Sequence, residues 1–191
     1  PEQPGEGEDP APEQPTHPES GDLTTTINGT EVTFDGNVTD AYGVNADDTK
    51  NELNVTYNRV IGDSYKNIWA NVSAMAAEND IFAVEITNNG DTKVKVRIDI
   101  TKDNAGGAMC NDSATANGNP ATTDHEYGGG SQFEIPANSS VVIEVKYFNT
   151  QNPYAVKFFI DSYTYQDGNT YAGNVTFANM QFKSSDTQDE E

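Results

Sequence analysis

The stretch Val94-Lys95-Val96-Arg97-Ile98-Asp99-Ile100 decides the fold class. Apolar and charged residues alternate through it without a break, at the period of two that is expected of a β-strand with one buried face. Residues 139–148 and 153–162 are rich in β-branched and aromatic residues, which are also typical of strands. The quoted stretch therefore predicts a sheet with one apolar and one polar face.

Outward from this stretch, the chain continues as short strand-like runs separated by Gly, Asn and Asp. Asn88-Asn89-Gly90-Asp91 separates residues 80–87 from residues 94–100, and an Asn-Gly pair between two such runs predicts a β-hairpin. Only residues 73–78 (SAMAAE) have helical character. Further strands are expected at residues 24–34, 53–60, 65–72 and 174–183. About eight to ten short strands predict an all-β fold, a two-sheet antiparallel β-sandwich of the jelly-roll type.

The two ends of the chain differ from its middle. Residues 1–22 contain six of the nine prolines and seven acidic residues, and residues 184–191 (SSDTQDEE) are polar and acidic. Neither end can bury a core, so we expect an acidic Pro-rich linker at 1–22, a domain at 23–183 and an acidic linker at 184–191. The linkers carry eleven of the 31 acidic residues and none of the ten basic ones. The formal charge of −21 thus falls to about −10 for the domain itself.

Charge and cysteine content exclude several classes of function. Ten basic residues against 31 acidic ones argue against binding to nucleic acid or to an anionic membrane. No run of residues is long and apolar enough to cross a membrane as a helix, so we expect no membrane insertion. Cys110 is the single cysteine, so it cannot form an internal disulfide, and we expect it to be a small buried side chain. Two linkers around one domain predict a monomeric module of a larger secreted protein.

A candidate binding surface emerges when the alternation is applied to residues 65–72. Ile68, Ala70 and Val72 would share the core face of that strand. The opposite face would then present four residues that combine flat aromatic rings with amides, namely Tyr65, Asn67, Trp69 and Asn71. Sugars require this combination, because their C–H faces stack on aromatic rings and their hydroxyls bond to planar polar groups. The competing interpretation is that Trp69, the only Trp, completes the core.

The same parity extends this face to other strands. Arg97 and Asp99 would lie on it, together with Lys95. In the run that follows residue 153, the non-core positions are Lys157, Phe159, Asp161, Tyr163 and Tyr165. The Gly-rich loop around Tyr127 could bring that ring to the rim of the same cleft. We expect a ligand-binding face formed by Trp69, Tyr65, Asn67, Asn71, Arg97, Asp99, Tyr127, Asp161 and Tyr163.

Acidic and amide residues of the chain also raise the question of metal binding and of catalysis. The Asp- and Asn-rich turns at 37–40, 45–48 and 161–168 offer the oxygen ligands that Ca²⁺ prefers, so a structural calcium ion is an expectation without named ligands. Asx-turns explain the same residues equally well. No catalytic motif occurs, and Asp161 with Glu126 would be the best candidate pair for a glycoside hydrolase. Seven Asn-X-Ser/Thr sequons are present, which an Asn-rich bacterial protein would contain by chance.

Several motifs also resemble a known class of module. They are Tyr57-Asn58-Arg59-Val60, Gly62-Asp63-Ser64-Tyr65-Lys66-Asn67-Ile68-Trp69-Ala70-Asn71-Val72, Lys93-Val94-Lys95-Val96-Arg97, Phe158-Phe159-Ile160-Asp161-Ser162 and Gly173-Asn174-Val175-Thr176-Phe177. These motifs are similar to carbohydrate-binding-module-like β-sandwiches that stand beside catalytic domains in secreted or cell-surface proteins of gut and rumen Firmicutes. The resemblance implies a jelly roll, often with a structural calcium, that binds glycan without catalysis. Where a similar region has Glu-Trp-Gly-Gly, this chain has Glu126-Tyr127-Gly128-Gly129.

Together these features predict a non-catalytic module that anchors its parent protein to a polysaccharide, either starch-like α-glucan or a plant cell-wall β-glycan. The expected location is extracellular or on the cell surface. Two alternatives remain open at this point. One is a structural or adhesin-like surface sandwich with Trp69 in its core, and the other is a small jelly-roll glycanase.

Overall fold

A computed structural model describes residues 20–36, 42–60, 67–103, 107–121, 123–124, 129–160 and 170–185. Within these residues the chain forms mainly strands. Their bounds are β1 Thr24–Ile27, β2 Thr30–Thr33, β3 Asp35–Gly36, β4 Tyr42–Asp47, β5 Glu52–Val60, β6 Ile68–Asn71, β7 Ile81–Asn88, β8 Val94–Lys102, β9 Asn111–Ala116, β10 Asn119–Pro120, β11 Thr123–Asp124, β12 Gly130–Ile135, β13 Ser139–Tyr147, β14 Pro153–Ile160 and β15 Thr170–Lys183. The helices are the α-helix α2, Ser73–Glu78, and the short 3₁₀ helix η1, Asn149–Gln151.

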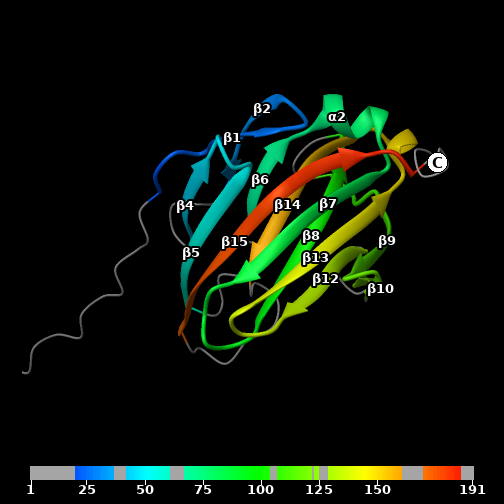
Figure 1. Ribbon diagram of the computed structural model, residues 1–191. Helices are drawn as coiled ribbons and strands as arrows, with labels where there is room; N and C mark the ends of the chain where they lie inside the picture. Colours follow the sequence, from blue (N-terminus) through cyan, green and yellow to red (C-terminus); the bar gives the residue numbers. More distant parts are fainter. Residues whose placement is uncertain are drawn as a thin grey trace, which may run out of the picture.

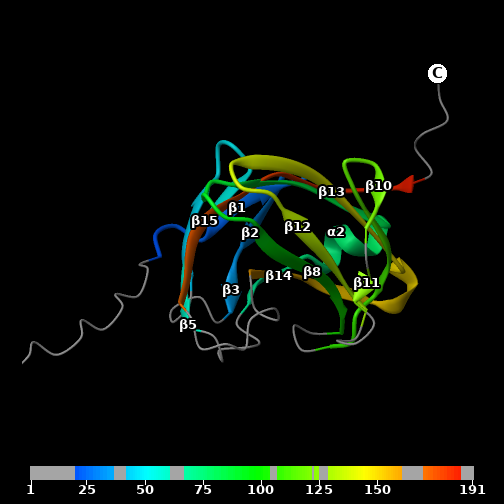
Figure 2. The same ribbon diagram turned by 90° about the horizontal axis from the view of Figure 1, so that it is seen from below.

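Two antiparallel sheets pack face to face, as Figures 1 and 2 show. In the described part of the chain, one sheet has seven strands in the order β10-β9-β13-β7-β15-β5-β4, and the other has six in the order β11-β12-β8-β14-β6-β3. From β5 to β9, and again from β12 to β15, successive strands alternate between the two sheets. The predicted two-sheet antiparallel β-sandwich is confirmed.

The core lies between the sheets and follows the alternation of the sequence. In β8, Val94, Val96, Ile98 and Ile100 are fully buried, and their neighbours on β14 are also apolar core residues. Phe158 of β14 stacks on Phe177 of β15 across the core, with ring centroids 4.4 Å apart. Because the apolar residues of each strand share one face, pairing the strands forms a continuous apolar surface. The helix α2 occurs where it is predicted, and it buries Met75 and Ala76.

The predicted hairpin at Asn88–Asp91 is wrong. The strand before it, β7, pairs with β13 and β15, whereas β8 pairs with β12 and β14 in the other sheet. The turn therefore carries the chain across the sandwich. Asn88 explains why: its buried amide donates to the carbonyls of Thr92, Ile135 and Pro136, and its Oδ1 accepts from Gly90 N at 2.9 Å. These tertiary contacts override the local preference of Asn-Gly for a hairpin.

The single strand predicted at 24–34 is instead a hairpin of two short strands, β1 and β2. Its turn, Asn28-Gly29, has φ values of 50° and 74°, which are the left-handed values that a tight hairpin turn requires. The strands β4, β9 and β12 also lie outside the ranges that the sequence pattern predicts. They carry more Gly, Asn and Ser than the predicted strands, so their composition resembles that of loops.

Both ends of the described chain bond to the sandwich. Gly21 N donates to Val44 O at 2.8 Å, and Ala46 N donates to Asp22 O at 2.7 Å, so this segment covers the edge of β4. At the other end, Ser185 donates through its amide and its hydroxyl to the carboxylate of Asp80. These contacts lie at opposite ends of the sandwich (Figures 1 and 2). Residues on the domain side of each linker are thus anchored to the fold.

Candidate functional site

The polar face of the six-stranded sheet carries the candidate site. One row of residues crosses four strands in register: Asp99 on β8 is opposite Lys157 on β14, Lys157 is opposite Trp69 on β6, and Trp69 is opposite Asp35 on β3. Side chains directly opposite each other in antiparallel strands have Cβ atoms about 4.5–5.5 Å apart. The sequence parity that placed Trp69 and Asp99 on one surface thus corresponds to a real row of neighbours.

Trp69 is half-buried on this face and is not part of the core. Its strand neighbours Ile68 and Ala70 are fully buried between the sheets, so the indole points the other way. In the described part of the chain the indole N–H makes no hydrogen bond, and the ring has no aromatic contact. The alternative that Trp69 completes the core is therefore excluded. Part of the side chain is covered by the protein, and the rest is exposed.

Asp99, the first residue of this row, forms a buried ion pair with Arg97 of the same strand. Arg97 Nε lies 2.7 Å from Asp99 Oδ1, and the two side chains are 2% and 1% exposed. The guanidinium also lies over the ring of Phe159, 5.8 Å from its centroid. Side chains so completely buried offer no surface to a ligand, so the expectation that Arg97 and Asp99 bond directly to sugar hydroxyls does not fit this structure. They form the floor of the site instead.

Gly130 of β12 leaves room for that ion pair. A Cβ at this position would lie 1.9 Å from Asp99 Oδ1 and 2.3 Å from Arg97 Nε. Real Cβ atoms do not approach polar atoms so closely, so any larger residue would displace the pair. Sequence reasoning missed this glycine because it belongs to a Gly-rich run, Gly128-Gly129-Gly130, that is also typical of a loop.

The other predicted site residues divide into two groups. Asn71 is exposed on the same face as Trp69, and its Oδ1 accepts hydrogen bonds from Ser73 N and Oγ at the start of α2. This leaves its amide hydrogens on the surface. Asn67 is half-buried and directly precedes β6. The remaining four residues lie outside the described residues, and they are Tyr65, Tyr127, Asp161 and Tyr163.

Lys157 is expected on the polar face but is not among the residues predicted to bind ligand. Sequence parity placed it on the polar face, but only strand register shows that it lies between Asp99 and Trp69. The side chain is half-buried. Burial, the largest cause, lowers the pKa of Lys157. Asp99 acts in the opposite direction and Arg97 adds to the lowering, so the pKa lies below its usual value.

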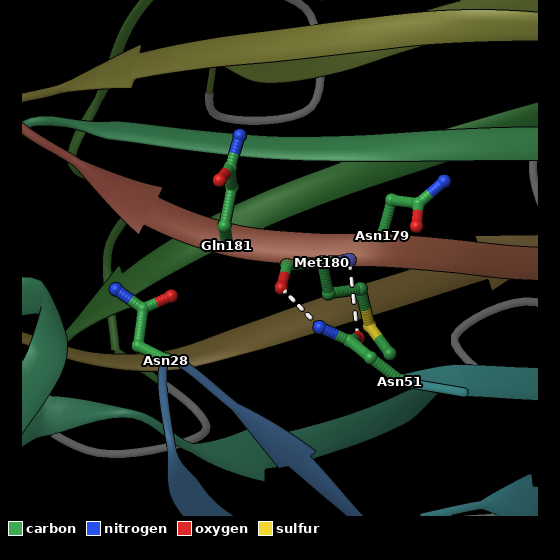
Figure 3. Close-up of a pocket in the computed structure, with 5 residues that line it drawn as sticks. All are labelled: Asn28, Asn51, Asn179, Met180 and Gln181. Carbon is green, nitrogen blue, oxygen red and sulfur yellow. Dashed lines mark hydrogen bonds between the residues drawn. The ribbon is translucent and has the colours of Figure 1, made fainter. Parts of the chain in front are cut away.

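A polar hollow of about 590 Å³ lies elsewhere, beside the C-terminal part of β15, which extends beyond its pairing with β5 (Figure 3). Asn28, Asn51, Asn179, Met180 and Gln181 line it. Asn51 Nδ2 donates to Met180 O at 2.6 Å, and Met180 N donates to Asn51 Oδ1 at 3.1 Å. Asn28 pairs with the backbone of Phe182 in the same way. These amides replace a missing neighbouring strand, so the hollow has a structural explanation.

Metal binding and the cysteine complete the description of the site. No group of three or more His, Cys, Asp or Glu side chains that could hold a metal ion occurs in the residues that the structure describes. The turn at 45–48 uses its carboxylates in protein contacts: Asp47 accepts from Thr49 and Lys50, and Asp48 accepts from Thr26. Cys110 is buried as predicted, and burial raises the pKa of its thiol.

Comparison with known proteins adds no family to this description. No protein-family model matches the chain, and no curated protein matches it. Among the described helices, none has the length and apolar character needed to cross a membrane.

Proposed function

We propose that this domain is a non-catalytic polysaccharide-binding module that holds its parent protein on starch or on a plant cell-wall glycan. The observation that carries the proposal is the half-buried indole of Trp69, which faces away from the core within a row of polar side chains. A rigid aromatic platform beside charged and amide groups matches the two kinds of surface on a sugar ring, which are apolar C–H faces and hydroxyl edges. We further propose that the parent protein is secreted or lies on the cell surface.

The buried ion pair supports this proposal by making the platform rigid. Arg97 and Asp99 pair with each other along β8, and the guanidinium packs over Phe159 of β14, so the contact holds these two neighbouring strands together. A preorganised surface loses little entropy when it binds an extended chain. Asn71 lies on β6 with Trp69, and Lys157 lies on the adjacent strand β14, so the amide hydrogens and the ammonium can donate to sugar hydroxyls beside the indole.

Affinity of one such site is expected to be weak. A shallow face that binds one or two sugar units would give a Kd between micromolar and millimolar, or about −8 to −4 kcal/mol. Weak single-site binding is sufficient for anchoring, because attachment raises the effective concentration of the parent protein at the polymer surface. The proposal includes a structural calcium ion only as a group that would stabilise the fold, not as one that would contact the polysaccharide.

Affinity electrophoresis through gels that contain starch, glycogen, β-glucan, xylan or mannan tests the proposal. The wild-type domain should be retarded in at least one gel, and Trp69→Ala should abolish the retardation while circular dichroism stays unchanged. Phe148→Ala is the matched control, because Phe148 is an exposed aromatic residue that follows β13 in the other sheet. Migration of the folded wild type unaffected by every polymer would overturn the proposal and favour a structural surface domain.

A further inference from the structure

Lys157 is the cation of the site that has no ion-pair partner among the residues that the structure describes. It lies between Asp99 and Trp69 in the cross-strand row, and the side chains of Lys157 and Trp69 are both half-buried. In the described residues its ammonium forms no hydrogen bond and no ion pair. The side chain is thus held near the indole by strand register alone.

The carboxylate of Asp99 does not neutralise Lys157, because it already forms an ion pair with Arg97. Asp99 Oδ1 is 2.7 Å from Arg97 Nε, and both side chains are buried, so their charges compensate each other. Burial and the nearby guanidinium lower the pKa of Lys157, and the attraction of Asp99 offsets them only in part, so the charged form is less stable here than in water. An anionic group bound beside the ammonium would remove this cost.

The other basic residues on this side of the sheet differ from Lys157. Lys93 Nζ bonds to Glu134 Oε2 at 3.0 Å, and Lys95 is directly opposite Glu134 in register. The described face therefore offers one uncompensated positive charge, adjacent to one aromatic platform. The domain as a whole carries an excess of about ten negative charges and would repel a densely charged polyanion.

From these contacts we infer that the site selects a polysaccharide with a neutral backbone and isolated carboxylate-bearing sugars, with a uronic acid ring stacked on Trp69 and its carboxylate bound by Lys157. The inference rests on the proposed function and names the ligand class more narrowly. The geometry is favourable, because a ring substituent on a sugar above the indole lies within one strand spacing of the lysine. A charge-assisted hydrogen bond is stronger than the neutral ones that the remaining hydroxyls can form.

The experiment compares glucuronoxylan with the same polymer after chemical reduction of its carboxylates to alcohols. Titration calorimetry of the full chain should show a Kd for the native polymer that is lower by about tenfold or more than for the reduced one. Raising the salt concentration should weaken binding to the native polymer and leave binding to the reduced polymer unchanged. Lys157→Gln should abolish the difference between the two polymers.

Lys146→Gln is the matched control, because Lys146 is an exposed lysine on β13 of the other sheet, and it should keep the tenfold preference. Equal binding of both polymers by the wild type, with loss of both in Trp69→Ala, would overturn the carboxylate inference and leave polysaccharide binding intact. If Lys157→Gln weakened binding to the native and the reduced polymer equally, the carboxylate inference would also be overturned, since the lysine would then be bonding a hydroxyl. Absence of binding to these and to all neutral polymers would overturn both proposals.

Discussion

Asn54 of β5 and Asn174 of β15 exchange side-chain hydrogen bonds in both directions across their paired strands. Asn54 Nδ2 donates to Asn174 Oδ1 at 3.0 Å, and Asn174 Nδ2 donates to Asn54 Oδ1 at 2.8 Å. Thr176 and Thr56 accept further bonds from the same two amides. Residues i and i+2 of a strand share a face, so the sequence Asn-Val-Thr on two antiparallel strands places each Asn opposite a Thr. Two of the seven sequons thus have a structural reason and are not chance.

Asn174→Ala should lower the free energy of unfolding by about 1 kcal/mol, because it removes the acceptor that Asn54 and Asn89 share. The loss stays modest because these side chains are partly exposed and water replaces the lost partner. Urea unfolding measures the change. Asn45→Ala, at an exposed position opposite Asn54 on β4, is the control and should change stability by less than about 0.5 kcal/mol. Equal losses in the two variants would contradict a specific role for the Asn54–Asn174 pair.

Gly130→Ala should destabilise the domain by about 1–3 kcal/mol, since the added methyl group overlaps the buried ion pair of Arg97 and Asp99. Thermal unfolding measures the change. Gly21→Ala is the comparison: the nearest atoms to its Cβ would all belong to the exposed Asn45 side chain, which can move away. A Gly130→Ala domain as stable as the wild type would show that the floor of the site can adjust.

Removing one partner of the Arg97–Asp99 pair should lower the free energy of unfolding more than replacing both partners with apolar residues. Asp99→Leu alone leaves a buried guanidinium without its carboxylate and should cost about 3–5 kcal/mol. The double variant Arg97→Met with Asp99→Leu should recover most of that loss, because apolar side chains of similar volume need no partner. A double-mutant cycle measured by chemical unfolding gives the coupling between the two residues. Strictly additive losses would mean that the two charges act independently.

The side-chain amides of Asn28 and Asn51, which bond to the backbone of β15, should contribute to stability and not to polysaccharide binding. Asn51→Ala removes both hydrogen bonds to the backbone of Met180 and should cost about 1–2 kcal/mol. Gln181→Ala, an exposed residue that lines the same hollow, should be close to neutral. Affinity gels should show unchanged polysaccharide retention for Gln181→Ala. A folded Gln181→Ala domain that is no longer retained would show instead that the hollow binds the ligand.

Acid should release the anchor at the end of β15. Burial raises the pKa of Asp80, but the two hydrogen bonds from Ser185 and the charge of Lys146 outweigh it, so the pKa lies below its ordinary value. A lowered folded-state pKa stabilises the fold above the unfolded value of about 3.9, and the contribution is lost as the pH falls through the folded pKa. The stability difference between wild type and Asp80→Asn should therefore shrink as the pH falls from 5 to 2. A difference that stays constant over this range would exclude the carboxylate as the cause. Asp112→Asn, at an exposed position of β9, controls for the loss of one carboxylate.

Local patterns predicted those elements whose two faces differ sharply in polarity. The alternation in residues 94–100 predicted a strand that corresponds to β8 and its buried face, and parity placed Trp69, Arg97 and Asp99 on the opposite surface. The same rules failed at Asn88–Asp91, because Asn-Gly chemistry favours a tight turn whether the next strand pairs beside the first or crosses to the other sheet.

Sequence by itself determined the all-β class, the core faces of β6 and β8 and the position of Trp69 away from the core, because these follow from the two-residue period of a strand. Only the tertiary structure decided which residues are neighbours. It buried Arg97 with Asp99, placed Lys157 beside Trp69 in the cross-strand row, and required glycine at position 130. The reason is that cross-strand register depends on contacts between residues far apart in the chain, which no local pattern encodes.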